Sequence, residues 1–240
     1  MYLGIDIGTS SVKAVLIDAR QRIVGTASAP LKVSRPKPGW SEQDPEAWWR
    51  ATRKALDTLK TAHPKAMAAV EGIGLSGQQH GATLLDASDK PLRPCILWND
   101  ARSGEECAAL EAAEPRFRDI CGNRLMAGFT APKLAWVRRH EPKLFRRIAM
   151  VLLPKDYVRL KLTGEHVSDM SDSAGTCWLD VGARRWSDAL LKACGLRVEQ
   201  VPRLVEGTEV SGRLRPALAK RWGMDLAPAV AGGGGDNPAS

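Results

Sequence analysis

The chain has 240 residues, of which 44% are hydrophobic, and a formal net charge of +8. This length and composition can bury enough apolar surface for one large domain or two small ones. No basic leader precedes the acid at Asp6, and the longest purely apolar run, residues 148–153, falls far short of the ~20 residues of a membrane-spanning helix. We therefore expect a globular, cytoplasmic protein with no membrane partner.

Charge and cysteine usage exclude two further classes. The basic residues come as isolated singles and pairs such as Arg138 and Arg139, interleaved with acids, which is typical of a solvated surface rather than a nucleic-acid interface. The five cysteines are odd in number, scattered, and never spaced as Cys-x-x-Cys. Neither a disulfide framework nor a structural zinc site is indicated.

The chain begins with three predicted strands, residues 2–6, 12–18 and 23–28, separated by short polar turns at residues 8–11 and 19–22. Strands joined by such short turns pair antiparallel, so the pattern predicts a three-stranded meander. This beginning excludes a simple Rossmann βαβ unit.

A helix is predicted to follow at Asp44, because an N-cap aspartate, a proline at the first helical position and an early acid at Glu46 stand in sequence. The apolar positions that share one face of this helix are Trp48, Ala55, Leu56 and Leu59. Pro64 is expected to stop it.

A buried strand over residues 70–75 is predicted to run into a small polar loop at residues 76–81, and loops at strand ends are where α/β domains usually bind ligands. The later predictions are a hairpin turn at residues 86–89, a strand ending at residues 96–98, helices at about residues 102–113, 133–140, 157–162 and 214–222, and four consecutive glycines at residues 232–235. Arg102 is expected to start a helix.

The order β-β-β-α-β followed by further helices and strands matches the ribonuclease-H-like core of sugar kinases, actin and the large heat-shock chaperones. Local stretches then resemble the sugar-kinase family that includes glycerol kinase, gluconate kinase and xylulokinase. The stretches that carry this resemblance, in the family's order, are residues 6–13, 76–82, 97–102, 128–134, 153–157, 168–172 and 232–237. The resemblance covers the whole chain. It implies an α/β fold of the actin-like ATPase type, with a mixed sheet flanked by helices.

The first of these stretches suits a phosphate. Asp6 lies where the first strand meets a turn and can hold Mg²⁺ or its water shell. Gly8, Thr9 and Ser10 expose backbone N–H groups and hydroxyls without bulk, which allows the phosphate of a nucleotide to approach closely. Thr9 is the strongest candidate for a phosphate contact. Lys13 is left out of the site, because its side chain could equally face solvent.

A second group of residues suits a sugar. In the loop between Gly77 and Gly81, Gln79 and His80 offer hydrogen-bond donors and acceptors to a polyhydroxylated ligand, although a lone histidine is more often structural. Trp98 can stack on the apolar face of a sugar, although an isolated tryptophan is more often core. Xylulokinases usually carry methionine where this chain has Gln79, which leaves the identity of the ketose open.

Asp236 is predicted to be the catalytic base that accepts the proton of the attacking hydroxyl, with Asn237 binding the sugar or ordering the loop. The glycines before Asp236 would let the chain turn and leave room for phosphates. Taken on composition alone, residues 232–240 are a flexible tail. The resemblance favours the catalytic interpretation.

The resemblance implies that residues 1–240 form the N-terminal, sugar-binding domain of a carbohydrate kinase that phosphorylates D-xylulose to D-xylulose 5-phosphate with ATP and Mg²⁺. A second domain, carrying most adenosine contacts, is absent from this chain. We therefore expect little activity from these residues alone. Family members are often dimers, which implies a homodimer for the full-length protein.

Three alternatives remain open. The sugar could be ribulose, gluconate, glycerol or another polyol, because the shape of the pocket selects it. A nucleotide-driven chaperone or filament protein is disfavoured by the loop with Gln79 and His80. A non-catalytic sugar-binding module is disfavoured by the presence of both Asp6 and Asp236.

Overall fold

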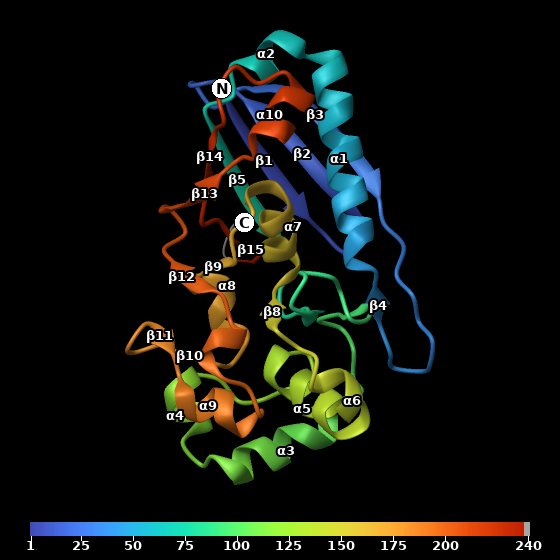
Figure 1. Ribbon diagram of the computed structural model, residues 1–240, viewed down its shortest axis with the longest axis vertical. Coiled ribbons are helices and arrows are strands. Elements are labelled where there is room, and N and C mark those ends of the chain that lie inside the picture. Colours follow the sequence, from blue (N-terminus) through green and yellow to red (C-terminus); the bar gives the residue numbers. More distant parts are fainter. Residues whose placement is uncertain (238–240) are drawn as a thin grey trace.

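The computed structural model describes residues 1–237; the last three residues of the predicted segment 232–240 lie outside the described part. The molecule is elongated, with a sheet and its covering helices at one end and a group of short helices and strands at the other (Figure 1). The described chain ends between these two parts. No helix among the described residues is long and apolar enough to cross a membrane.

The sheet begins with the predicted meander. Strands β1 (Tyr2–Ile7), β2 (Ser11–Ile17) and β3 (Ile23–Pro30) pair antiparallel in sequence. Strand β5 (Gly72–Gly77) then joins β1 in parallel, which confirms a mixed sheet. The order is completed by strands from the end of the chain, namely β13 (Val210–Arg213), β14 (Ala229–Ala231) and β15 (Gly234–Gly235), of which β14 and β15 both pair with β5.

Helix α1 (Pro45–Ala62) covers one face of this sheet. The side chain of Asp44 caps it by accepting the N–H of Glu46, and the four predicted apolar positions are all buried. Helix α1 ends before Pro64, as predicted. Pro64 is also the first residue of the short helix α2 (Pro64–Ala68). The prediction for this helix is confirmed.

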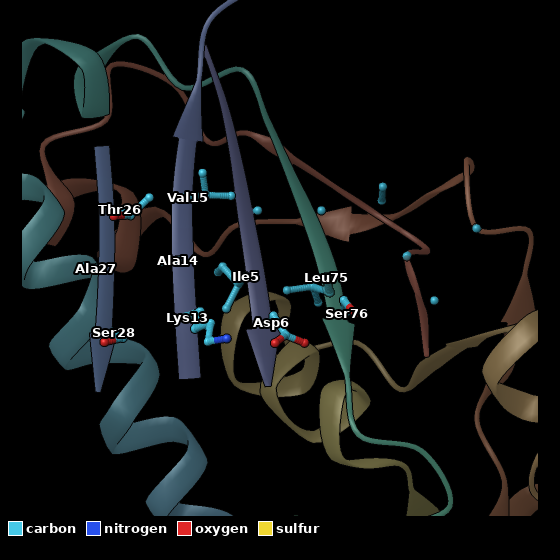
Figure 2. Close-up of a pocket in the computed structure, with 16 residues that line it drawn as sticks. Ile5, Asp6, Lys13, Ala14, Val15, Thr26, Ala27, Ser28, Leu75 and Ser76 are labelled. Atoms are coloured by element: carbon cyan, nitrogen blue, oxygen red, sulfur yellow. The ribbon is translucent and has the colours of Figure 1, made fainter. Parts of the chain in front are cut away.

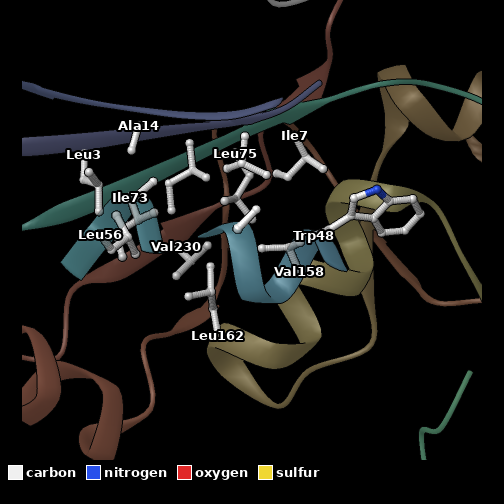
Figure 3. Close-up of a cluster of buried hydrophobic side chains, with 14 of the residues drawn as sticks. Leu3, Ile7, Ala14, Trp48, Leu56, Ile73, Leu75, Val158, Leu162 and Val230 are labelled. Carbon is white, nitrogen blue, oxygen red and sulfur yellow. The ribbon is translucent and has the colours of Figure 1, made fainter. Parts of the chain in front are cut away.

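The core under that face is built by strand residues that alternate inward. Leu3, Ile7, Ile73 and Leu75 point from the strands towards Trp48 and Leu56 of α1, as Figure 3 shows. Helices α7 (Pro154–Thr163) and α10 (Pro216–Trp222) complete the cluster. Because strand side chains alternate, Gly4 and Asp6 of β1 and Gly74 and Ser76 of β5 lie on the opposite side of the sheet. That side carries the pocket described below.

A second apolar cluster holds the other end of the molecule together, around Phe117, Leu134 and Trp178. The elements of this end and of the connections to the sheet are β4 (Glu42–Gln43), β6 (Thr83–Leu85), β7 (Cys95–Ile96), α3 (Gly104–Ala113), α4 (Phe117–Cys121), α5 (Thr130–His140), α6 (Pro142–Phe145), β8 (Met150–Leu152), β9 (Val167–Asp169), α8 (Met170–Ala174), β10 (Leu179–Asp180), β11 (Arg185–Trp186), α9 (Asp188–Ala193), a 3₁₀ turn (Val198–Gln200) and β12 (Arg203–Val205). The predicted turn at residues 86–89 is present, with the N–H of Asp89 donating to the carbonyl of Asp86.

The prediction that Arg102 starts a helix is wrong, because α3 begins at Gly104. The guanidinium of Arg102 instead lies 3.5 Å from the centre of the Trp40 ring and forms ion pairs with Glu42 and Asp100. These buried contacts hold the chain outside the helical conformation. The local pattern of the sequence contained no sign of them.

Candidate active site

The predicted phosphate turn, residues 8–11, follows β1 and is closed by a backbone hydrogen bond. The N–H of Gly8 donates to the carbonyl of Ser11 at 3.1 Å, and a Cβ at Gly8 would crowd that same oxygen. Thr9 receives the indole N–H of Trp98 on its hydroxyl at 3.1 Å. Ser10 is exposed at the tip. The turn therefore presents small polar groups to solvent on a fixed backbone.

Two glutamines that sequence reasoning missed support this turn. The amide of Gln43 donates to the carbonyl of Thr9 at 2.7 Å, and buried Gln78 accepts the Thr9 hydroxyl at 3.2 Å. Gln78 also donates to Gln43 at 2.8 Å, and Gln43 accepts the indole N–H of Trp48. Only the adjacency of Gln78 to Gln79 hinted at this role, since Gln43 is distant in sequence.

The two predicted carboxylates lie at the ends of β1 and β15, the two strands that flank the end of β5. Asp6 is aligned with Ser76 of β5, and the N–H of Asp236 donates to the carbonyl of Gly77 at 2.8 Å. The pKa of Asp6 is raised, first by burial and then by the negative charge of Asp236. The structure thus brings these two acids into one electrostatic site.

The glycine run that leads to Asp236 is a fixed strand in the part that the structure describes. Gly233 has a φ of +70°, and an added Cβ would collide with the Leu75 carbonyl. The buried guanidinium of Arg159 donates to the carbonyls of Ala231 at 2.7 Å and Gly232 at 2.5 Å. The interpretation of residues 232–237 as a flexible tail is therefore wrong.

A pocket of about 860 Å³ opens on the sheet face opposite α1 (Figure 2). Asp6, Lys13 and Ser76 project into it from three adjacent strands. Gly4 and Gly74 have no side chains and so leave space above the sheet. The ammonium charge of Lys13 lowers the pKa of Asp6, against the effect of burial. Lys13, which the sequence left undecided, thus faces the pocket.

The predicted sugar loop is the segment between Gly77 and Gly81. In it His80 has a left-handed backbone, with a φ of +65°. Its Nδ1 lies 3.0 Å from the carbonyl of Gly175, and its ring meets the Phe129 ring edge-on at 4.8 Å. Burial, with the nearby charge of Lys133, lowers the pKa of His80 to about 4. A neutral imidazole whose Nδ1 donates to a carbonyl keeps Nε2 as an acceptor.

The remaining predicted sugar residues lie on both sides of this loop. The side-chain amide of Asn237 donates to Gln79 at 3.4 Å, which links the predicted sugar loop to the segment that follows β15. Gly235 lies against the side chain of Gln79, where an added Cβ would approach within 2.5 Å. Trp98 is 47% exposed, so its ring is not core. Its indole N–H faces the phosphate turn rather than open solvent.

The acids of the site suit a magnesium ion that retains most of its water. Among residues 1–237 there is no group of three or more His, Cys, Asp or Glu side chains able to hold a metal. One carboxylate oxygen of Asp6 is buried and has no hydrogen-bond partner within this part of the chain. Mg²⁺ is commonly bound through one or two carboxylates together with water and substrate phosphates. Asp6 and Asp236 fit that donor set.

The fold and site define an α/β core of the actin-like ATPase type, with a phosphate turn and two acids gathered around β5. Residues 1–240 match the family described as "FGGY family of carbohydrate kinases, N-terminal domain". The chain belongs to this family.

Named relatives agree with this assignment. The chain is 56% identical over 239 residues to the xylulose kinase of Escherichia coli K12, covering 100% of this chain and 49% of that protein. The xylulose kinase of Bacillus subtilis is 39% identical, with 98% of this chain and 47% of that protein covered. The chain thus spans about half the length of these curated relatives.

Solved structures share the fold. A crystal structure described as a xyloylose kinase from Brucella ovis has a TM-score of 0.98 and 62% identity, covering all of this chain and 49% of that one. Glycerol kinase of Plasmodium falciparum with ADP, at 20% identity, has a TM-score of 0.89, with coverages of 98% and 48%. At that identity the likeness concerns the fold alone. The predicted ribonuclease-H-like fold is confirmed.

Proposed function

We propose that the protein carrying this chain transfers the γ-phosphoryl group of ATP to D-xylulose, giving D-xylulose 5-phosphate and ADP. The observation that carries the proposal is the meeting of Asp6 and Asp236 beside β5, with the phosphate turn and the sugar loop on adjoining strand ends. Relatives named xylulose kinase at up to 56% identity support the choice of sugar.

In this proposal Asp236 accepts the proton of the sugar hydroxyl as its oxygen bonds to phosphorus and the bond from phosphorus to the ADP oxygen breaks. The N–H groups of Thr9 and Ser10 bind phosphate oxygens, Gly8 leaves room for their approach, and Lys13 adds positive charge beside them. His80 accepts a sugar hydroxyl on Nε2. Asp6 would hold Mg²⁺, which when bound neutralises charge on the phosphate oxygens.

We further propose that the whole protein has a second domain that faces the pocket on the open side of the sheet and binds the adenosine. The relatives are about twice as long as this chain, and Asp6 lines the pocket. Sugar and ATP are then its partners. The proposal includes a cytoplasmic location, no nucleic-acid or membrane partner, and a homodimer of the full-length protein.

The deciding experiment is coupled ATP consumption by the full-length protein with D-xylulose, D-ribulose, gluconate or glycerol at equal concentrations. We expect selective turnover of D-xylulose. Because Gln79 takes the place of the usual methionine, selective turnover of another polyol would change the assigned sugar and keep the kinase. No turnover of any of them would favour the non-catalytic sugar-binding module.

Replacing Asp236 with Asn in the same assay tests the base. Loss of a general base typically costs 10²- to 10⁴-fold, so we expect a fall of at least about 100-fold in kcat. The exposed Asp225, replaced by Asn, is the matched control and should leave turnover unchanged. An Asp236→Asn variant with more than about a tenth of normal kcat would contradict the mechanism.

A further inference from the structure

Lys133 of α5 is fully buried, with 0% of its surface exposed, and none of the ion pairs found among residues 1–237 includes it. An ammonium group removed from water without an opposite charge is costly. Burial accordingly lowers the pKa of Lys133 to about 7. The side chain therefore needs an explanation other than a salt bridge.

Nearby titratable groups do not supply that explanation. Asp100 is committed to the guanidinium of Arg102 and to the N–H of Ser41. Burial raises the pKa of the Cys95 thiol to about 12, so Cys95 is neutral at ordinary pH. What Lys133 contacts directly is backbone: its Nζ donates to the carbonyl of His80 at 2.7 Å and to that of Gly128 at 2.6 Å.

The His80 end of this bridge is a strained position. A left-handed φ is unfavourable for any residue with a Cβ, and His80 persists in it because its surroundings impose it. Its carbonyl accepts two donors, Lys133 and the hydroxyl of Thr130 at 3.2 Å. The following Gly81 has no room to shift, since an added Cβ would lie 2.6 Å from Pro154.

The other carbonyl that Lys133 contacts, that of Gly128, lies in the segment that packs against Trp98. A Cβ at Gly128 would lie 2.6 Å from the carbonyl of Trp98, so the two segments touch through their backbones. Phe129, the next residue, places its ring edge-on to His80. One ammonium group thus joins the segment that carries His80 to the segment that abuts Phe129 and Trp98.

We propose that Lys133 is a positioning residue of the sugar pocket, which fixes the His80 imidazole and the Trp98 wall at one separation by bridging the His80 and Gly128 carbonyls. The expected effect on sugar binding rests on the proposed sugar-kinase function. It assigns Lys133 no contact with reacting atoms. A rigid separation favours a sugar whose hydroxyls match it, because a preorganised site loses less free energy in ordering on binding.

The test compares Lys133→Met with the exposed control Lys143→Met in the full-length protein. Methionine is an unbranched side chain close to lysine in length, and it cannot donate to either carbonyl. We expect the KM for the sugar to rise at least tenfold, the KM for ATP to stay within about twofold, and Lys143→Met to match the wild type. An unchanged KM for the sugar, or equal rises in both KM values, would overturn the proposal.

A spectroscopic signature separates this inference from the proposed function. In ¹⁵N-histidine-labelled protein, the His80 signals, assigned by their absence in His80→Gln, should show an Nδ1-protonated ring in the wild type and a mixture of tautomers in Lys133→Met. If the wild type phosphorylates no sugar, the proposed function fails, while this change still tests the bridge. An unchanged His80 spectrum would refute the bridge.

Thr130→Val serves if Lys133→Met does not fold. It removes one of the two donors to the same His80 carbonyl and keeps the shape of the side chain. We expect a two- to fivefold rise in the KM for the sugar alone. A Thr130→Val variant with normal sugar KM and normal His80 signals would also count against the proposal.

Discussion

Burial decides which form each titrating side chain takes in this site. His80 is neutral because its ring is removed from water, and its donor is used by the Gly175 carbonyl. Burial raises the pKa of Asp6, the negative charge of Asp236 raises it further, and the positive charge of Lys13 lowers it. The imidazole in the predicted sugar loop is thus uncharged, whereas side chains of both signs lie beside Asp6.

The neutral state of His80 makes a prediction about pH. With its pKa lowered to about 4 from the ordinary 6.5, folded His80 binds no proton at pH 5, whereas the unfolded chain does. His80 therefore costs stability as pH falls from about 6.5 to 4, by up to about 3 kcal/mol, and nothing above that window. We expect sugar affinity, measured by calorimetry on the full-length protein, to be flat from pH 8 to 5.

The matched variant for this prediction is His80→Gln, which cannot titrate in this window. Relative to His80→Gln, the wild type should lose stability to urea only below about pH 6.5. A drop of tenfold in sugar affinity between pH 7 and 6 would show that His80 titrates normally, against the neutral imidazole described here.

Among the elements, those built from local patterns were predictable and those built from distant contacts were not. The cap at Asp44 and the apolar face of α1 follow from a few neighbouring residues, and both were predicted correctly. The glycines of β15 carry no side-chain pattern, so only pairing with β5 makes them a strand. The direction of the Lys13 side chain could not be predicted either, because it depends on which side of the sheet α1 covers.

The site shows the same division. Asp6, Thr9, His80 and Asp236 belong to short motifs, from which the sequence predicts them as site residues; their roles stay predictions. Gln43 and Lys133 were missed, because Gln43 contacts the Thr9 carbonyl from 34 residues away and Lys133 contacts the His80 carbonyl from 53 residues away. A lysine in a helix is ordinarily exposed, so its residue type gave no signal of burial.

The glycines that lead to Asp236 yield a prediction about the stability of this element. Gly233→Ala combines a left-handed backbone with a collision against the Leu75 carbonyl, and should destabilise the full-length protein by about 2 to 4 kcal/mol in urea unfolding. Because Asp236 follows three residues later, turnover should fall as well. Gly104→Ala is the control, since a Cβ there meets nothing within 4 Å. It should be neutral or slightly stabilising. Equal stability of the two variants would contradict the fixed strand.

In the whole molecule, the phosphate turn and both acids lie beside an open sheet face rather than in an enclosed site. Two apolar clusters, one under α1 and one around Trp178, are built from the described residues. The pocket of about 860 Å³ is lined mainly by strands of one sheet, with Gly207 of the loop before β13. A nucleotide lying there would contact protein mainly on the sheet side. We therefore expect the folding of these residues to be separable from the proposed phosphoryl transfer.

This separation predicts the behaviour of residues 1–240 made alone. Both clusters are built from residues of this chain, so we expect a cooperative thermal transition by circular dichroism and weak binding of D-xylulose by calorimetry. Phosphoryl transfer depends on positioning the nucleotide and stabilising its charge, so a site open on one side should turn over at least about 1000-fold more slowly than the full-length protein. Turnover near the full-length rate would place every catalytic contact on this one sheet and remove the need for a second domain. A folded chain that binds no sugar would instead mean that the loop with His80 acquires its binding geometry only beside the rest of the protein.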